Sequence, residues 1–219
     1  MKETNELVKS KTKLAIWIAS NCQDTLQAKR RMELTQKLTD EGLSLDKFGK
    51  CFNSVIDGNQ LPSLIKQYKF YLAFENSLHC RDYITEKFMI NSLLYGAVPV
   101  VLGATKSDYE AIAPPHSFIF AEDFSPRTLV EYLNYLDKNE SAYREYLQWR
   151  TILPFNIDAP PSQFCQLCRV VHGINVDNLR NSEYNKSYSR IPLFGFPDRP
   201  RRVSLVKWWL GTENTDCVK

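Results

Sequence analysis

Short apolar runs alternate with segments of helical periodicity over the first 150 residues of the chain. The runs at residues 13–19, 70–74 and 97–102 are almost entirely apolar, which is typical of strands buried on both faces of a sheet. Residues 24–40 and 85–95 follow two of these runs and are predicted to be helices. Strands that alternate with helices at this spacing predict βαβ units, so the expected fold class is α/β with a mostly parallel sheet.

Weaker signals place the remaining elements. Residues 43–48 alternate in the manner of a strand, and Ser125-Pro126 predicts a helix that has proline at its favoured first position and ends near residue 136. Pro99 has no N–H to donate, so we expect either that its strand lies at an edge or that Pro99 is the first paired residue. The other predicted elements are a connector or helical turn at 61–66, a short strand at 117–120 and a helix over 141–150.

Composition divides the chain into three parts. Residues 1–12 are a polar lead-in, residues 13–150 are expected to form the α/β domain, and residues 151–219 a C-terminal extension strapped back onto it. The extension contains a C-x-x-C pair, which we interpret as disulfide bracing because no second C-x-x-C exists to complete a zinc site. The six cysteines are compatible with three disulfides in any of 15 connectivities, or with six reduced thiols. They are Cys22, Cys51, Cys80, Cys165, Cys168 and Cys217.

Bulk composition narrows the function classes. Hydrophobic residues make up 43% and charged residues 24% of the 219 residues, as in a globular protein. The formal net charge of +3 argues against a nucleic-acid scaffold. No apolar run approaches the roughly 18 residues that span a bilayer, and the first residues lack the apolar core of a secretory signal. These features alone suggest a cytosolic protein.

Polar and charged side chains gather where the strand at 70–74 ends and the next helix begins. Glu75 and Asn76 follow the strand directly, and Glu86 and Lys87 lie in the first turn of the predicted helix. The free amides and the positive dipole end of a helix N-terminus attract an anion, and Lys87 adds a charge-assisted hydrogen bond worth roughly 1.5–3 kcal/mol. The alternative is a helix start exposed to solvent. Because this helix follows a strand that ends in polar residues, a site for a phosphorylated ligand is favoured over that alternative.

Motifs that are missing constrain how a phosphate would be bound. The sequence contains no D-x-D pair to chelate a divalent cation, and neither G-x-x-x-x-G-K nor G-x-G-x-x-G. A bound diphosphate would therefore be neutralised by amides, lysine and arginine and not by an obligatory metal. Arg31, or its neighbour Arg30, on the helix after the first strand is the candidate for a second cation.

Several motifs closely resemble the α1,3-fucosyltransferase family. They are FYLAFENS at 70–77, DYITEKF at 82–88 and GAVPVVLG at 96–103, and the resemblance extends from WIASN at Trp17 to the C-x-x-C at Cys165. The SNC at Ser20, the C-x-x-C-x-x-x-H and the Lys-Trp-Trp-x-Gly near the C-terminus look most like members that fucosylate the core of N-glycans. Lewis-type members are the close alternative.

The resemblance implies a Rossmann-like domain that forms the C-terminal, donor-binding half of a two-domain GT-B fold. It implies transfer of fucose from GDP-β-fucose to a GlcNAc hydroxyl of a glycoprotein N-glycan, in α1,3 linkage with inversion. It implies no obligatory cofactor, with a divalent cation at most stimulating the reaction, and no nucleic-acid partner. The implied location is the lumen of the Golgi apparatus, with membrane attachment only through an anchor that this chain lacks.

The resemblance also assigns roles to individual residues. Lys87 matches the residue that holds a phosphate, Tyr83 one on the nucleoside side, and Glu86 one near the fucose or ribose that also gives electrostatic support to the developing oxocarbenium ion. For the arginine that binds phosphate, Arg31 is preferred to Arg30, although its distance from the Ser-Asn pair is longer than in the family. The remaining residues of the expected pocket are Glu75, Asn76 and Ser20.

The chain departs from the family in one major respect. The catalytic base of the family is a carboxylate in an N-terminal acceptor domain, which this chain lacks. We therefore expect either a fragment of an active enzyme or a shortened relative, a non-catalytic module that binds the GDP-sugar. A third, weaker alternative is an α/β interaction protein that has lost the ligand.

Overall fold

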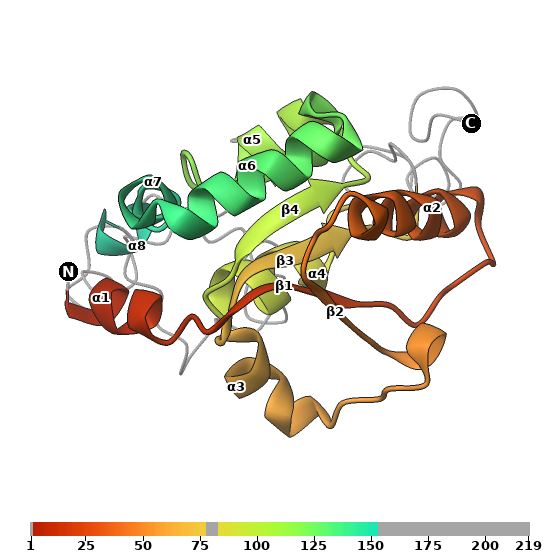
Figure 1. Cartoon of the computed structure of the whole chain (residues 1–219), viewed down its shortest axis with the longest axis horizontal. Coiled ribbons are helices and arrows are strands. Elements are labelled where there is room, and N and C mark those ends of the chain that lie inside the picture. The colour runs from red at the N-terminus through yellow and green to blue at the C-terminus, as the bar shows by residue number, and fades with distance from the viewer. Residues whose placement is uncertain (1, 78–82, 153–219) are drawn as a thin grey trace, which may run out of the picture.

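The computed structural model describes residues 2–77 and 83–152, and within them five strands form a single parallel sheet (Figure 1). The strands are β1 (Lys13–Ile18), β2 (Leu45–Phe48), β3 (Tyr68–Phe74), β4 (Val98–Leu102) and β5 (Ile119–Phe120). Their order across the sheet is β2-β1-β3-β4-β5, and every neighbouring pair is parallel. The predicted α/β class is confirmed, and the sheet is Rossmann-like.

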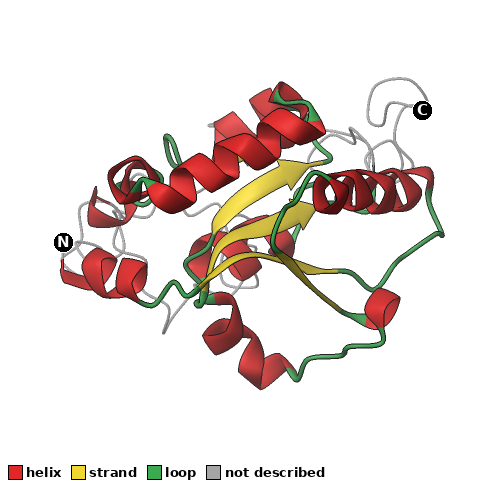
Figure 2. Ribbon diagram, in the orientation of Figure 1, coloured by secondary structure: helices red, strands yellow, loops and turns green. Residues whose placement is uncertain are grey.

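Helices cover both faces of this sheet (Figure 2). On one face α2 (Leu26–Asp40) packs beside α6 (Pro126–Lys138), together with α1 (Lys2–Lys9) and α7 (Glu140–Glu145). The other face carries α3 (Leu61–Ile65), α4 (Glu86–Phe88), the π-helical turn η3 (Met89–Leu94), α5 (Lys106–Ile112) and α8 (Trp149–Ile152). Single 3-10 turns lie in the connections, namely η1 (Lys50–Phe52), η2 (Gly58–Gln60) and η4 (Ala121–Asp123).

The central strand β3 shows how the sequence builds two cores. Phe70, Leu72 and Phe74 are buried in the core on the α2 and α6 side. Tyr71 and Ala73 are buried in the core on the opposite face. Because side chains alternate along a strand, a continuous apolar run covers both faces at once. This explains why the run lacked the polar alternation of a strand that is exposed on one side.

Pro99 corrects one prediction. Its strand, β4, lies between β3 and β5, so it is not an edge strand, and Pro99 is its second residue, opposite Tyr71 of β3. The pairing of β4 with β5 begins only at Val100, which is opposite Ile119. On the β5 side, therefore, Pro99 precedes the paired residues, and its missing N–H removes no hydrogen bond of that ladder.

Other differences from the sequence predictions concern the helices. Neither α1 nor α5 was anticipated, although α5 begins at a capping box formed by Thr105 and Asp108, which is a recognisable signal. The helix expected over 141–150 is divided into α7 and α8 by a turn at residues 146–148. The helix expected over 85–95 starts as α4 and continues as a π-helical turn. The remaining predicted elements up to residue 150 are present within a few residues, whereas residues 153–219, with their three cysteines, lie outside the described part of the chain.

The packing of α6 against the sheet yields a test of the fold. Leu133 of α6 is fully buried, and Leu26 of α2 is 71% exposed, so the same substitution meets opposite environments. We expect Leu133→Ala to lower the free energy of unfolding by about 2–5 kcal/mol because it leaves a cavity. Leu26→Ala should change it by less than about 0.5 kcal/mol. Urea denaturation followed by circular dichroism measures both, and equal effects would contradict the placement of α6.

Candidate functional site

The strand order places a switch point between β1 and β3. The chain passes from β1 through α2 to β2 on one side, and the later strands β3, β4 and β5 follow in order on the other side. In open parallel sheets, ligands bind beyond the carboxyl ends of the strands at such a point. A hollow of about 350 Å³ lies there. Its lining residues are Ile18, Ala19, Ser20, Asn21, Arg31, Lys50, Tyr71, Asn76, Glu86, Lys87 and Asn91.

Five of the seven predicted site residues line this hollow. They are Ser20, Arg31, Asn76, Glu86 and Lys87. Two larger hollows, of about 470 and 520 Å³, contain none of the seven. The structure therefore brings most of the predicted residues together from segments that are up to 67 positions apart, between Ser20 and Lys87.

Glu75 is placed differently from the prediction. It was expected to line the pocket, but its side chain is fully buried and is not among the lining residues. Its Oε1 accepts hydrogen bonds of 2.9 Å from both the backbone N–H and the hydroxyl of Thr85, and its Oε2 accepts one of 3.1 Å from Lys87 Nζ. A buried carboxylate needs such donors, because burial without them is costly. Glu75 thus positions the start of α4 and the ammonium of Lys87.

The close approach of β4 to Glu75 requires a glycine. Gly103, directly after β4, has φ +144°, and a Cβ on it would lie 2.6 Å from Glu75 Cβ. A side chain at this position would therefore collide with the residue that holds Lys87. This accounts for the glycine that ends the GAVPVVLG motif.

The helix α4 begins at a side-chain cap. Thr85 is the N-cap residue, and its hydroxyl accepts a hydrogen bond from the backbone N–H of Lys87. Tyr83 is partly buried and is not among the residues that line the hollow. Its predicted nucleoside contact therefore stays a prediction.

Arg31 and Arg30 point to different places. Arg31 is 1% exposed and lines the hollow, where its Nη1 donates to the carbonyl of Phe74 (2.8 Å) and its Nη2 to that of Asn21 (2.5 Å). Arg30 instead forms an ion pair of 2.9 Å with Glu122. The structure thus places Arg31, the preferred candidate, at the hollow and Arg30 away from it.

The buried guanidinium of Arg31 has an unpaired donor and no ion pair with a described carboxylate. Burial lowers the pKa of its guanidinium, and the neighbouring Glu75 opposes that shift. Its Nε has no hydrogen-bond partner, and no carboxylate of the described residues lies within 4.0 Å of the guanidinium. A buried cation without an ion pair is costly, so an anion in the hollow would stabilise it. Free donors on a buried guanidinium are also the groups that bind phosphate well.

The lining residues carry an excess of positive charge. Three cations, Arg31, Lys50 and Lys87, face one carboxylate, that of Glu86, whose side chain is 55% exposed. Across the described ranges, no group of three or more histidine, cysteine, aspartate or glutamate side chains could hold a metal ion. The arrangement can bind an anionic group through protein cations, and metal independence stays a prediction.

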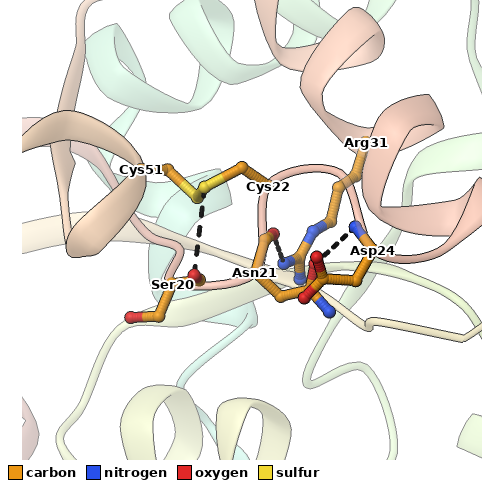
Figure 3. Close-up of a disulfide and its surroundings, with 6 residues drawn as sticks. All are labelled: Ser20, Asn21, Cys22, Asp24, Arg31 and Cys51. Atoms are coloured by element: carbon orange, nitrogen blue, oxygen red, sulfur yellow. Dashed lines mark hydrogen bonds between the residues drawn. A yellow bond between two sulfur atoms is a disulfide. The ribbon is translucent and has the colours of Figure 1, made fainter.

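Sequence reasoning missed Lys50 and the side chains around it. Lys50 follows β2, the neighbour of β1, so its position at the same edge could have been inferred once the strand order was known. A disulfide joins Cys51 to Cys22, with a Cα–Cα distance of 5.6 Å (Figure 3). The even cysteine count allowed this pair among many and could not select it.

A parallel sheet with a hollow lined by cations at its switch point is the arrangement of open α/β domains that bind ligands beyond the carboxyl ends of their strands. The family model described as "Glycosyltransferase family 10 (fucosyltransferase) C-term" matches residues 8–189. The chain therefore belongs to the glycosyltransferase family 10 fucosyltransferases. The family predicted from the sequence motifs is confirmed.

Similar curated proteins agree with this assignment. Alpha-(1,3)-fucosyltransferase 7 of Bos taurus is 42% identical over 161 residues, which cover 73% of this chain and 45% of the relative. The Bos taurus 3-galactosyl-N-acetylglucosaminide 4-alpha-L-fucosyltransferase FUT3 is 41% identical over 168 residues, 76% of this chain and 44% of the relative. The Pongo pygmaeus 4-galactosyl-N-acetylglucosaminide 3-alpha-L-fucosyltransferase FUT6 is 41% identical over 160 residues, which cover 73% of this chain and 43% of the relative. The chain spans less than half the length of these relatives.

None of the helices in the described part combines the length and apolar character needed to cross a bilayer.

The buried ion pair at the site can be tested through stability. Glu75→Gln removes the charge that compensates Lys87, whose side chain is only 13% exposed, so we expect the free energy of unfolding to fall by about 3 kcal/mol. Glu86→Gln is the matched control, because Glu86 is largely exposed and its 3.5 Å pair with Lys87 should contribute less than about 1 kcal/mol. Denaturant titrations of the two variants measure the difference. A smaller loss for Glu75→Gln than for Glu86→Gln would rule out the positioning role of Glu75.

Proposed function

We propose that this chain is the donor-binding half of an enzyme that transfers fucose from GDP-β-fucose to a GlcNAc hydroxyl of a glycoprotein glycan, in α1,3 linkage with inversion. One observation carries the proposal. Lys87 of the DYITEKF motif and Arg31, far from it in sequence, line one hollow at the switch point of a fucosyltransferase-family domain. Membership of the family supports the donor and the sugar, and the hollow supplies a place for the diphosphate.

Different residues at the site contact different parts of the donor. Lys87 and Arg31 hold the diphosphate, and the exposed Glu86 meets the fucose or ribose. Tyr83, which does not line the hollow, contacts the nucleoside where it extends beyond the lining residues. Asn76 and Ser20 complete the wall. Glu75 acts through Lys87 and Thr85 and does not touch the donor.

The proposed reaction combines these positions with the family's chemistry. The acceptor hydroxyl attacks C1 of fucose on the face opposite to GDP, and the bond from C1 to the phosphate oxygen breaks with its electron pair leaving on GDP. Lys87 and Arg31 stabilise the charge that develops on the diphosphate, which is the largest demand in the transition state. Glu86 gives electrostatic support to the positive charge on the sugar. The proton of the hydroxyl passes to a carboxylate supplied by the acceptor-binding part of the enzyme.

The acceptor and the compartment are part of the same proposal. The SNC and C-x-x-C motifs favour the GlcNAc of an N-glycan core, whereas the names of two relatives specify galactosyl-N-acetylglucosaminides, in which the GlcNAc carries galactose. A GlcNAc hydroxyl is common to both. The disulfide between Cys22 and Cys51 supports the Golgi lumen, because such bonds persist in oxidising compartments.

A second candidate is a module that binds the GDP-sugar without transferring it. The hollow and its cations bear on binding of the GDP-sugar alone, which both candidates share. A radiolabelled transfer assay separates the two, run with this chain alone and with an N-terminal half of a relative added. Transfer in either case supports the enzyme, and GDP-fucose binding without transfer in both supports the module.

Donor binding gives the direct test of the proposed function. Isothermal titration should show that GDP binds and that EDTA leaves the affinity unchanged, because protein cations and not a metal neutralise the diphosphate. We expect Lys87→Ala to weaken binding by about ten- to a hundredfold, the loss of one charge-assisted hydrogen bond. Lys106→Ala is the matched control, since Lys106 pairs with Asp123 away from the hollow, and it should bind as the wild type does. Unchanged affinity in Lys87→Ala would remove the role assigned to Lys87.

A further inference from the structure

The loop after β2 forms one wall of the hollow. Because β2 lies beside β1, the carboxyl ends of both strands meet at the same edge of the sheet. Lys50, the first residue of η1, lines the hollow from the β2 side, while Lys87 lines it from the β3 side. Ser20 and Asn21, which follow β1, lie in the wall between them. The strand order therefore puts two lysines on opposite flanks of one cavity.

The backbone of this loop is held against the end of β1. Gly49 has φ +103°, and a Cβ on it would lie 2.2 Å from the carbonyl oxygen of Ala19. The N–H of Ala19 donates to the carbonyl of Phe48 (2.8 Å), and the N–H of Cys51 donates to the carbonyl of Ala19 (3.1 Å). Only glycine fits this close approach with a positive φ. The glycine thus brings the backbone of Lys50 to the rim of the hollow.

The disulfide joins the same two segments covalently. Cys22 is adjacent to Asn21, and Cys51 is adjacent to Lys50, so the bond links two residues that each neighbour a lining residue (Figure 3). The carbonyl of Asn21 also accepts the hydrogen bond from Arg31 Nη2. The bond therefore connects the Lys50 wall to the segment that positions Arg31.

The charge balance of the hollow leaves a diphosphate in need of a further cation. Lys87 already pairs with the buried Glu75, and both terminal nitrogens of Arg31 donate to backbone carbonyls. Lys50 is exposed and forms no ion pair with any described carboxylate within 4.0 Å. A nucleoside diphosphate carries more negative charge than Arg31 can balance together with a Lys87 that Glu75 already compensates. Lys50 supplies the further cation.

We propose that Lys50 is an additional phosphate-binding residue of the donor site, held at the hollow by Gly49 and by the Cys22–Cys51 disulfide. This inference rests on the proposed function, since it takes the diphosphate of the donor as the ligand. It assigns to the β2 loop a role in binding the diphosphate, whereas Lys87 and Arg31 come from the β3 and β1 connections.

The test compares ligands with and without phosphate. Isothermal titration of the full chain with GDP, inorganic pyrophosphate and guanosine measures each affinity at low and at moderate salt. Lys50→Ala should lower the affinity for GDP and for pyrophosphate about tenfold at low salt, and by less at moderate salt. Its affinity for guanosine should equal that of the wild type. Lys50→Arg should retain most of the affinity. Lys47→Ala is the matched control on β2, outside the hollow, and should match the wild type.

The disulfide is tested in the same assay. A Cys22→Ser/Cys51→Ser variant, with its fold checked by circular dichroism, should bind GDP several-fold more weakly. Adding Lys50→Ala to it should then cost less than in the wild type, because the two changes act on one wall. Additive losses would overturn the role of the disulfide in holding Lys50.

The outcomes separate this inference from the proposed function. The phosphate role of Lys50 is overturned if Lys50→Ala binds GDP and pyrophosphate as the wild type does. It is also overturned if the variant's affinity for guanosine falls by the same factor as its affinity for GDP. In both cases the proposed donor site stands. If the wild type binds pyrophosphate but not GDP, the nucleotide assignment fails and Lys50 is still judged with pyrophosphate. If neither ligand binds, both proposals fail.

Discussion

The carboxylate of Glu75, buried at the end of β3, connects the sheet to the candidate site. Burial of a charged group is unfavourable unless donors surround it, and here Thr85 and Lys87 supply them from the start of α4. The pair fixes where the helix begins and where the ammonium lies. Gly103 permits it by leaving room beside the Glu75 side chain. Cations positioned in this way can stabilise an anionic ligand without having to reorganise when it binds.

The topology of the sheet assembles the rest of the hollow around that pair. Parallel strands in the order β2-β1-β3 bring three connections to one edge, and each contributes a cation: Lys50 after β2, Arg31 on the helix after β1 and Lys87 after β3. Burial of Arg31 lowers the pKa of its guanidinium and leaves its Nε without a partner. An anion would offset the cost of burying this charge, so the lining of the hollow and the family assignment are compatible with the same class of ligand.

The family and the length of the chain together define what this half can do. The chain contains a fucosyltransferase-family domain with a hollow lined by cations, and the relatives are more than twice as long as the matched region. The matched region covers under half of each relative, so the comparisons bear on this part of the family's proteins. The disulfide between Cys22 and Cys51 rigidifies the donor side, because it links the loops that follow β1 and β2.

The amino-acid sequence determined the α/β class, most of the strand and helix segments of the domain, and the motif around Lys87. These follow from local periodicity, capping residues and short motifs, which act over a few positions. The tertiary structure decided that Glu75 supports the site without lining it, and that Arg31 and not Arg30 lines the hollow. It also decided that Lys50 lines the hollow and that Cys22 pairs with Cys51 next to two of the lining residues. It also placed Pro99 in an interior strand. Those outcomes depend on which strands become neighbours and which side chains lose contact with water, and such long-range packing has no signature in local sequence spacing.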